Sequence, residues 1–290
     1  MANRTAPVLV FFEMNVDLVK SLDYTQNYLN FIVYFYKVKY RNMKKELLIK
    51  LLNIVGFAAA LYVNYLSVVT QLGGRSIREL SDKYANLFTP ANQTFAIWSL
   101  IYTLVLIFLI TQFLPTQRSV RFYNNYLFSI SCLLNGAWIV AWQLEYISLS
   151  LIIMFALLTT LAIINQQAHT EKLLVPKIVF GVYLGWICIA TIANITTWLV
   201  SLNIAISLSM QVFLTLAILI VAAILVAWIM KKLSNPFLAI AVTWAFYGIY
   251  VKRIADVSEI AYTALGMAVL VVLAIGIFSI YPGTKKVQAR

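Results

Sequence analysis

Three groups of aromatic and amide residues are each spaced so that they share one face of a helix. They are Trp98 with Tyr102, Asn135 with Trp138, and Trp186 with Ala190 and Asn194. Indole rings stack on flat apolar molecules, and a few amides suffice to orient such a molecule in a pocket. Ala190 leaves space between a large ring and an amide, which indicates a pocket wall. From spacing alone, a close contact filled by a neighbouring helix is an equally good interpretation.

Residue patterns for catalysis or metal binding are missing from the sequence. It has no glycine-rich phosphate loop, no nucleophile with a base, and no cluster with metal-ligand spacing. Cys132 and Cys188 fall inside apolar runs, which predicts two small buried hydrophobes. His169 lies alone in a polar connector. We therefore predict a protein that is not an enzyme and requires no cofactor.

The composition indicates that the chain is solvated mostly by lipid. Of its 290 residues, 62% are hydrophobic and 11% are charged, whereas soluble domains carry about 25% charged residues. The formal charge of +12 does not indicate nucleic-acid binding, because the basic residues lie between apolar runs and form no dense face. The bilayer is thus the expected partner, and nucleic acid is not.

Eight apolar segments are long enough to be membrane spans, each needing roughly 20 residues. They cover residues 47–68, 94–114, 123–144, 147–166, 175–200, 206–230, 236–251 and 259–281. The short turn at 143–146 makes spans three and four an antiparallel pair. The fold class is therefore all-α, a polytopic membrane protein with about eight transmembrane helices.

The basic residues predict the orientation of these spans. Fourteen of them lie in connectors on the side of the N-terminus, and five lie on the other side. The positive-inside rule then places both termini in the cytoplasm, in a bacterial plasma membrane by our expectation. The longest connector, loop 70–93, faces outside, and connectors of this length often cover binding sites.

Polar residues in the first span suggest helix packing. Asn53, Gly56, Ala60 and Asn64 lie on one stripe, where small residues permit close approach and amides hydrogen-bond across it. Residues 1–42 contain no span. We expect a flexible extension or a misassigned start before Met43, and an amphipathic segment on the membrane surface is the alternative.

At residues 46–200 the chain resembles the TspO/MBR family of tryptophan-rich sensory and translocator proteins. Three blocks carry the resemblance: Thr89-Pro90 followed by Trp98-Ser-Leu-Ile-Tyr102, then Leu134-Asn135-Gly-Ala-Trp138, then Tyr183-Leu-Gly-Trp186 leading to Ala190 and Asn194. They occur in the family's order, on its second, third and fifth helices.

The resemblance implies a five-helix bundle over 43–200. The three further spans and the short basic tail over 201–290 have no counterpart in the five-helix members of that family. The resemblance also implies a pocket for porphyrins, sterols or similar ligands, lined by Trp98, Tyr102, Asn135, Trp138, Trp186, Ala190 and Asn194. Thr89 and Asn92 stand where the family has proline and tryptophan. The sterol-associated tyrosine and arginine are Ile195 and Leu199, which argues against sterol binding.

The resulting hypothesis is a membrane sensor or receptor that binds a hydrophobic planar ligand such as a tetrapyrrole. A porphyrin would be its ligand rather than a required cofactor, and a homodimer is compatible with this function. The alternative is a transporter of a small amphipathic solute, although no carboxylate near the middle of a span marks an ion pathway. A third hypothesis is light-dependent porphyrin breakdown. The role of the last three helices is open.

Overall fold

The computed structural model describes residues 6–114, 122 and 125–280, and all the regular structure in this part of the chain is helical. The elements are α1 (Ala6–Val69), η1 (Leu72–Gly74), α2 (Ile77–Lys83), η2 (Asn92–Ala96), α3 (Ile97–Thr111), α5 (Leu127–Gln143), α6 (Ile147–Thr170), α7 (Leu174–Ser201), α8 (Leu208–Leu233), α9 (Leu238–Arg253) and α10 (Ser258–Ile280). Contacts divide the chain into two units, residues 1–49 and 50–290.

The first unit consists, in its described part, of the N-terminal portion of α1. Within it, the Lys44 ammonium lies 4.5 Å from the centre of the Tyr40 ring, a cation–π contact along one helix face. Residues 6–42 are helical because they belong to α1. The expectation that 1–42 is a flexible or misassigned extension stays a prediction.

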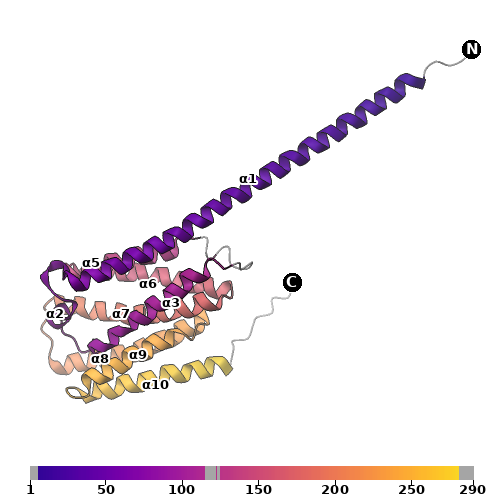
Figure 1. The fold of residues 1–290 in the computed structure, drawn as a ribbon. Coiled ribbons are helices and arrows are strands. Elements are labelled where there is room, and N and C mark those ends of the chain that lie inside the picture. Colours follow the sequence, from indigo (N-terminus) through magenta and orange to yellow (C-terminus); the bar gives the residue numbers. More distant parts are fainter. Residues whose placement is uncertain (1–5, 115–121, 123–124, 281–290) are drawn as a thin grey trace, which may run out of the picture. The chain divides into compact units, whose positions relative to one another are not determined.

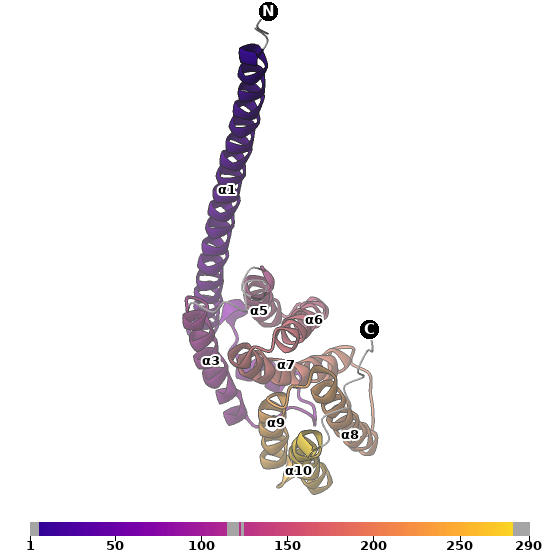
Figure 2. The same cartoon turned by 90° about the vertical axis from the view of Figure 1, so that its right-hand side faces the viewer.

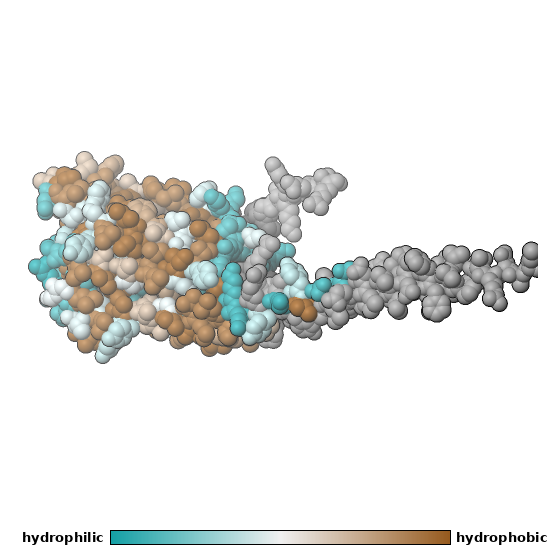
Figure 3. Space-filling model, turned by 90° about the horizontal axis from the view of Figure 1, so that it is seen from above, coloured by the Kyte–Doolittle hydropathy of each residue, from teal (hydrophilic) through white to brown (hydrophobic). Residues whose placement is uncertain are grey.

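The second unit has a helix in each range where a span was predicted. Six of these helices are long and apolar enough to cross a membrane, namely those containing Met43–Val69, Asn92–Thr111, Ile147–Thr170, Leu174–Ser201, Leu208–Leu233 and Ser258–Gly276. The other two, α5 and α9, have 17 and 16 residues. The all-α membrane fold is confirmed, whereas eight crossings stay a prediction. Figure 3 shows a hydrophobic band on the visible face of this unit, with hydrophilic residues at its two ends.

Helix α7 is the centre of the second unit (Figures 1 and 2). It packs against α6 on one side and α3 and α9 on others, and α9 packs in turn against α10. In its most apolar window, 72% of the residues are buried, more than in any other candidate span of the described chain. Residues that position a site around α7 therefore come from both the predicted five-helix part and the last three helices.

Four phenylalanine rings form the core at one end of α3, α5 and α7. Phe108 contacts Phe180 at 5.0 Å and Phe128 at 5.1 Å between ring centres, both edge to face, and Phe122 joins the group at 6.2 Å. Edge-to-face pairs add to the stabilisation from burial alone. The cluster holds these helices together away from the tryptophans.

Two buried amides connect α6, α7 and the turn before α9. Asn235 donates to the Asn165 side-chain oxygen at 2.7 Å and to the Lys177 carbonyl at 2.8 Å. Asn165 donates in turn to the Phe180 carbonyl at 2.8 Å. Since a buried polar group without a partner is costly, this chain of bonds fixes the start of α9 on α7.

Gly181 and Gly185 allow α9 to approach α7. A Cβ added at Gly181 would lie 2.7 Å from the Asn235 side chain, and one at Gly185 would lie 2.3 Å from the Leu238 carbonyl oxygen. The two glycines therefore form the contact of α7 with the turn before α9 and with the first residue of α9.

The polar stripe of the first span packs on α3 and α5, as predicted. Asn53 donates to Gln112 at 3.2 Å and accepts from Ser129 at 2.7 Å, while Asn64 donates to Asn135 at 3.4 Å. Gly56 lies against Cys132, 3.5 Å from an added Cβ to the cysteine Cβ. Cys132 and Cys188 are both buried and unbridged.

Candidate functional site

A cavity between α3, α5 and α7 brings together residues from each of the three sequence groups. It holds about 80 Å³ of free space, and we call it the aromatic chamber. Its lining residues are Ser81, Thr89, Pro90, Phe95, Trp98, Trp138, Trp142, Trp186, Ile189, Ala190, Ala193, Asn194 and Thr197. Pockets that enclose drug-sized ligands measure about 300–1,000 Å³, so a ligand of that size requires the chamber to widen.

Trp98 and Trp186 form one wall of the chamber. Their rings meet edge to face with centres 6.2 Å apart, and Phe95 meets Trp186 in the same way at 5.8 Å. Behind Trp98, the Tyr183 ring lies at 5.9 Å. Because Trp186 is 3% exposed, this wall is a packed part of the bundle and not a belt at the membrane interface.

Trp138 and Asn194 form the opposite wall. The indole N–H of Trp138 donates to the Asn194 side-chain oxygen at 3.1 Å, and the Asn194 amide donates to the Ala190 carbonyl at 2.8 Å. Trp142 stacks on Trp138, with ring centres 6.5 Å apart and planes 23° apart. Asn194 therefore orients the Trp138 ring in this state, and both ends of its side-chain amide are already engaged.

Tyr102 and Asn135, the other two residues of the predicted site, lie outside the chamber lining. The Tyr102 ring packs 5.5 Å from Trp98 and 6.0 Å from Phe57, and its hydroxyl is buried without a partner among the described residues. Asn135 accepts from Asn64, while its amide nitrogen has no partner in that same part of the chain. They support the chamber from behind. Ligand binding by all seven residues stays a prediction.

Loop 70–93 contributes Ser81, Thr89 and Pro90 to the lining. The Asn86 side-chain oxygen accepts from the Phe88 and Thr89 amides at 3.1 and 3.0 Å and from the Thr89 hydroxyl at 3.0 Å, a local turn that buries Thr89. Thr89 thus takes a structural role at the position where the related family has proline. Asn92 is exposed and is not part of the chamber.

Helix α9 holds the end of this loop in place. Buried Arg253 donates to the carbonyls of Asn86 at 2.8 Å and Leu87 at 3.1 Å. The Gly248 carbonyl accepts from the Ala91 amide at 3.0 Å. The Trp244 indole donates to the Thr94 carbonyl at 2.7 Å. These bonds place α9, the second of the last three helices, in direct support of the chamber.

Glu145 holds the beginning of the same loop. It forms ion pairs with Arg75 and Lys83, and it accepts from the Tyr84 hydroxyl at 2.8 Å. The hydrogen bond from Lys83 is the main reason that the pKa of Glu145 lies below its usual value, and the same bond raises the pKa of Lys83. Glu145 lies in the turn between α5 and α6, so the loop is tied to that end of the bundle.

Several chamber residues were missed by sequence reasoning. Trp142 follows Trp138 by four residues on the same helix face, and this spacing was the available signal. Ala193 and Thr197 follow the Ala190 stripe in the same way. Ser81 and Phe95 come from the short helices α2 and η2, and Pro90 comes from the segment between them, where runs are too short for periodicity to give a signal. Arg253 acts through main-chain carbonyls. Among the described residues, no group of potential metal ligands forms a site.

Comparison with known proteins agrees with this architecture. The family model described as TSPO-like protein matches residues 50–277, whereas no curated protein and no solved structure gives a match. The matched range contains all the chamber residues, and it continues through α8, α9 and most of α10, beyond the 46–200 of the sequence resemblance. The match covers most of the chain, including α9, which supports the loop over the chamber. The chain therefore belongs to the TSPO-like protein family.

Proposed function

We propose that this integral membrane protein is a sensor or receptor that binds a hydrophobic planar ligand, such as a tetrapyrrole, in the aromatic chamber. The observation that carries the proposal is the convergence of Trp98, Trp138, Trp142 and Trp186 on one cavity. Four indole rings around one space provide stacking surfaces on several sides of a flat molecule. Thr197 and Ser81 supply hydroxyls at its edge.

Ligand binding in this proposal requires the chamber to open. Its free space of about 80 Å³ is small, and loop 70–93 covers it. The helices below the loop are packed, so the loop is the element that moves in this proposal. Its two ends are held by hydrogen bonds from Arg253 and by ion pairs of Glu145, which break when the chamber opens. A ligand that binds the open state better shifts the population toward it and stabilises it by mass action.

For the membrane orientation, we propose cytoplasmic termini and an outer loop 70–93, in a bacterial plasma membrane. The support is the excess of basic residues in connectors on the side of the termini, fourteen against five. The chamber then opens toward the outside. A membrane-impermeant thiol reagent applied to cells should label Ala85→Cys, in the loop, and spare His169→Cys, at the other end of α6.

Tryptophan fluorescence tests the binding proposal in purified full-length protein. Titration with protoporphyrin should quench part of the emission in a saturable way. Trp186→Ala and Trp98→Ala should each weaken the apparent affinity by tenfold or more, since a stacking ring contributes on the order of 1 kcal/mol or more beyond its burial.

Trp228→Ala is the matched control, because Trp228 is 55% exposed and lies against Lys232 outside the chamber. It should lower the total emission and leave the affinity unchanged. Quenching that never saturates, or an affinity reduced equally in all three variants, would show that porphyrin binds nonspecifically and would overturn the proposal.

A further inference from the structure

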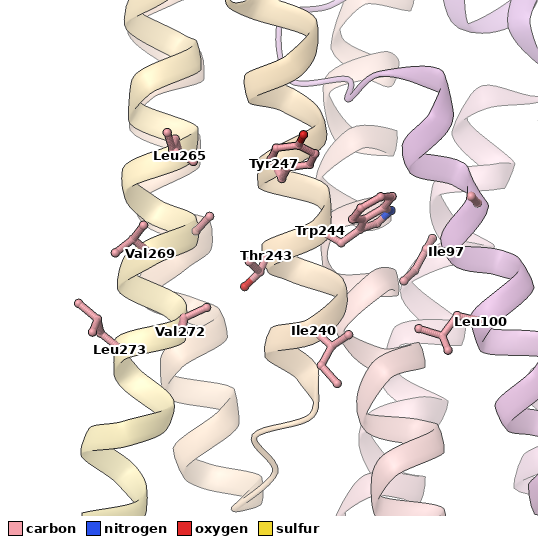
Figure 4. A pocket seen from close by; sticks show the side chains of 12 residues that line it. Ile97, Leu100, Ile240, Thr243, Trp244, Tyr247, Leu265, Val269, Val272 and Leu273 are labelled. Atoms are coloured by element: carbon pink, nitrogen blue, oxygen red, sulfur yellow. The ribbon is translucent and has the colours of Figure 1, made fainter.

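A larger hollow lies on the other face of α3 from the aromatic chamber. It has a volume of about 740 Å³ and lies between α3, α9 and α10 (Figure 4). Phe95 and Trp98 face the chamber, whereas Ala96, Ile97 and Leu100 line this hollow. The remaining wall residues are Ile240, Thr243, Trp244, Tyr247, Leu265, Ala268, Val269, Val272 and Leu273. We call it the α3–α9–α10 groove.

One polar group in the groove wall lacks a hydrogen-bond partner among the described residues. The buried hydroxyl of Thr243 has no hydrogen-bond partner there, and its oxygen points into the space between α9 and α10 (Figure 4). Other threonines in apolar helices, such as Thr191 and Thr215, donate to the carbonyl four residues earlier at 2.7 and 2.8 Å. A buried hydroxyl without a partner destabilises the protein, so a hydrogen bond from a ligand to Thr243 removes this penalty and favours binding.

The aromatic wall of the groove is rigid. Trp244 and Tyr247 lie one turn apart on α9, with ring centres 6.0 Å apart and planes 33° apart. The Trp244 indole is fixed by its bond to the Thr94 carbonyl. Two neighbouring rings, tilted by 33° and with Trp244 held in place, offer an apolar surface to a ring system that lies beside them.

The shape of the groove favours a compact ligand over an extended chain. Its lining covers residues 240–247 of α9 and 265–273 of α10, which is about 11–12 Å along the helices at about 1.5 Å per residue. A volume of 740 Å³ over that length makes it short and wide. It falls within the range of about 300–1,000 Å³ that encloses drug-sized molecules.

We propose that the α3–α9–α10 groove is a second ligand site, which takes a compact polycyclic hydrophobic molecule with one hydroxyl or carbonyl group. The rings of the ligand lie against Trp244 and Tyr247, and its polar group pairs with the Thr243 hydroxyl. The ligand enters sideways from the lipid phase, since Leu100, Val269 and Leu273 at the rim are exposed on a membrane-spanning surface. This site is independent of the function proposed for the chamber.

The test uses 1-hydroxypyrene and pyrene, a pair of fluorescent polycyclic probes that differ by one hydroxyl. Full-length protein in lipid nanodiscs is titrated with each probe, and energy transfer from tryptophan to the probe is recorded. Empty nanodiscs give the background from partition into lipid. We expect saturable transfer with both probes and an affinity about threefold to tenfold higher for 1-hydroxypyrene, the usual value of one hydrogen bond.

Two variants test whether the probes bind in the α3–α9–α10 groove. Thr243→Val keeps the shape of the side chain, and it should remove the advantage of 1-hydroxypyrene while pyrene binds as before. Ala96→Phe fills the groove from an exposed position and should abolish the saturable energy transfer from tryptophan to both probes. Ala58→Phe, at an exposed alanine of α1 outside the groove, should bind both probes like the parent.

Three results would overturn the proposal. The first is saturable transfer that Ala96→Phe leaves unchanged. The second is a hydroxyl advantage that persists in Thr243→Val. The third is a change of oligomeric state in Ala96→Phe without a change in probe binding, which would make the groove an interface between two copies of the chain. Trp98→Ala separates the two sites, because it should leave probe binding intact whether or not it weakens porphyrin binding in the chamber.

Discussion

The guanidinium of Arg253 donates to the main-chain carbonyl oxygen of Asn86 across 2.8 Å, which joins α9 to the loop that covers the aromatic chamber. The two residues are 167 positions apart in the chain. Asn86 in turn uses its side-chain oxygen to shape the segment around Thr89 and Pro90. Helix α9 is therefore part of the construction of the chamber.

Replacing Arg253 should loosen the loop. Arg253→Ala leaves the Asn86 and Leu87 carbonyls without their charged donor, and we expect a loss of about 2–4 kcal/mol in unfolding free energy, measured by thermal unfolding in detergent. Arg253→Lys should recover only part of it, because an ammonium does not reproduce the planar fork. Lys252→Ala is the neighbouring control. Equal losses in Arg253→Ala and Lys252→Ala would contradict the assigned role.

The close contact at Gly248 gives a second test of the same interface. A Cβ there would lie 2.0 Å from the Thr94 hydroxyl oxygen, so Gly248→Ala should destabilise by about 1–3 kcal/mol through overpacking. Gly266→Ala on α10 meets nothing within 4 Å and should stabilise by about 0.5–1 kcal/mol. Adding Thr94→Ala to Gly248→Ala should restore part of the loss. An equal change in melting temperature for Gly248→Ala and Gly266→Ala would show that α9 does not pack closely against η2 at Gly248.

The Glu145 ion pairs predict a response of the loop to pH and salt. The pKa of Glu145 is lowered in the folded protein, so its contribution is complete above the ordinary value of about 4.3 and is lost as the pH falls through the folded value. Amide hydrogen exchange in residues 72–85, corrected for intrinsic rates, should therefore accelerate in that acid range and in high salt.

Glu145→Gln should show the faster exchange already at neutral pH, with little further change on acidification. Glu171→Gln, at the other end of α6, serves as the control and should keep the parent's pH profile. If amide hydrogen exchange of residues 72–85 is the same in Glu145→Gln and the parent, the ion pairs of Glu145 do not hold the loop.

Trp138 and Asn194 should be energetically coupled. A double-mutant cycle with Trp138→Phe and Asn194→Ala should give an interaction energy of about 0.5–1.5 kcal/mol from thermal unfolding. The coupling arises from the hydrogen bond that the Trp138 indole N–H donates to Asn194. Trp138→Phe removes this donor and keeps an aromatic ring next to Trp142. A coupling energy near zero would mean that the bond does not orient the indole.

The helices and the aromatic groups could be predicted from sequence because both depend on local periodicity. Apolar runs located the long helices of the second unit, whereas the short helix α2 inside the predicted loop 70–93 was not predicted. Four-residue steps marked the helix faces that bring Trp98, Trp138 and Trp186 to one cavity. The contact of Gly181 and Gly185 with the start of α9 could not be predicted, because one helix buried on all sides carries several stripes, and spacing does not assign a stripe to a neighbour. The support from Arg253 was invisible because main-chain acceptors leave no side-chain pattern.

Porphyrin binding to Ala190→Leu measures most directly whether the aromatic chamber is the ligand site. Ala190 is a small residue between Trp186 and Asn194, and a leucine there occupies the chamber's limited space without removing an aromatic ring. The account predicts that saturable quenching of tryptophan fluorescence by protoporphyrin is lost in Ala190→Leu and kept in Ala58→Leu, at an exposed alanine of α1. An unchanged dissociation constant in a folded Ala190→Leu protein would contradict it.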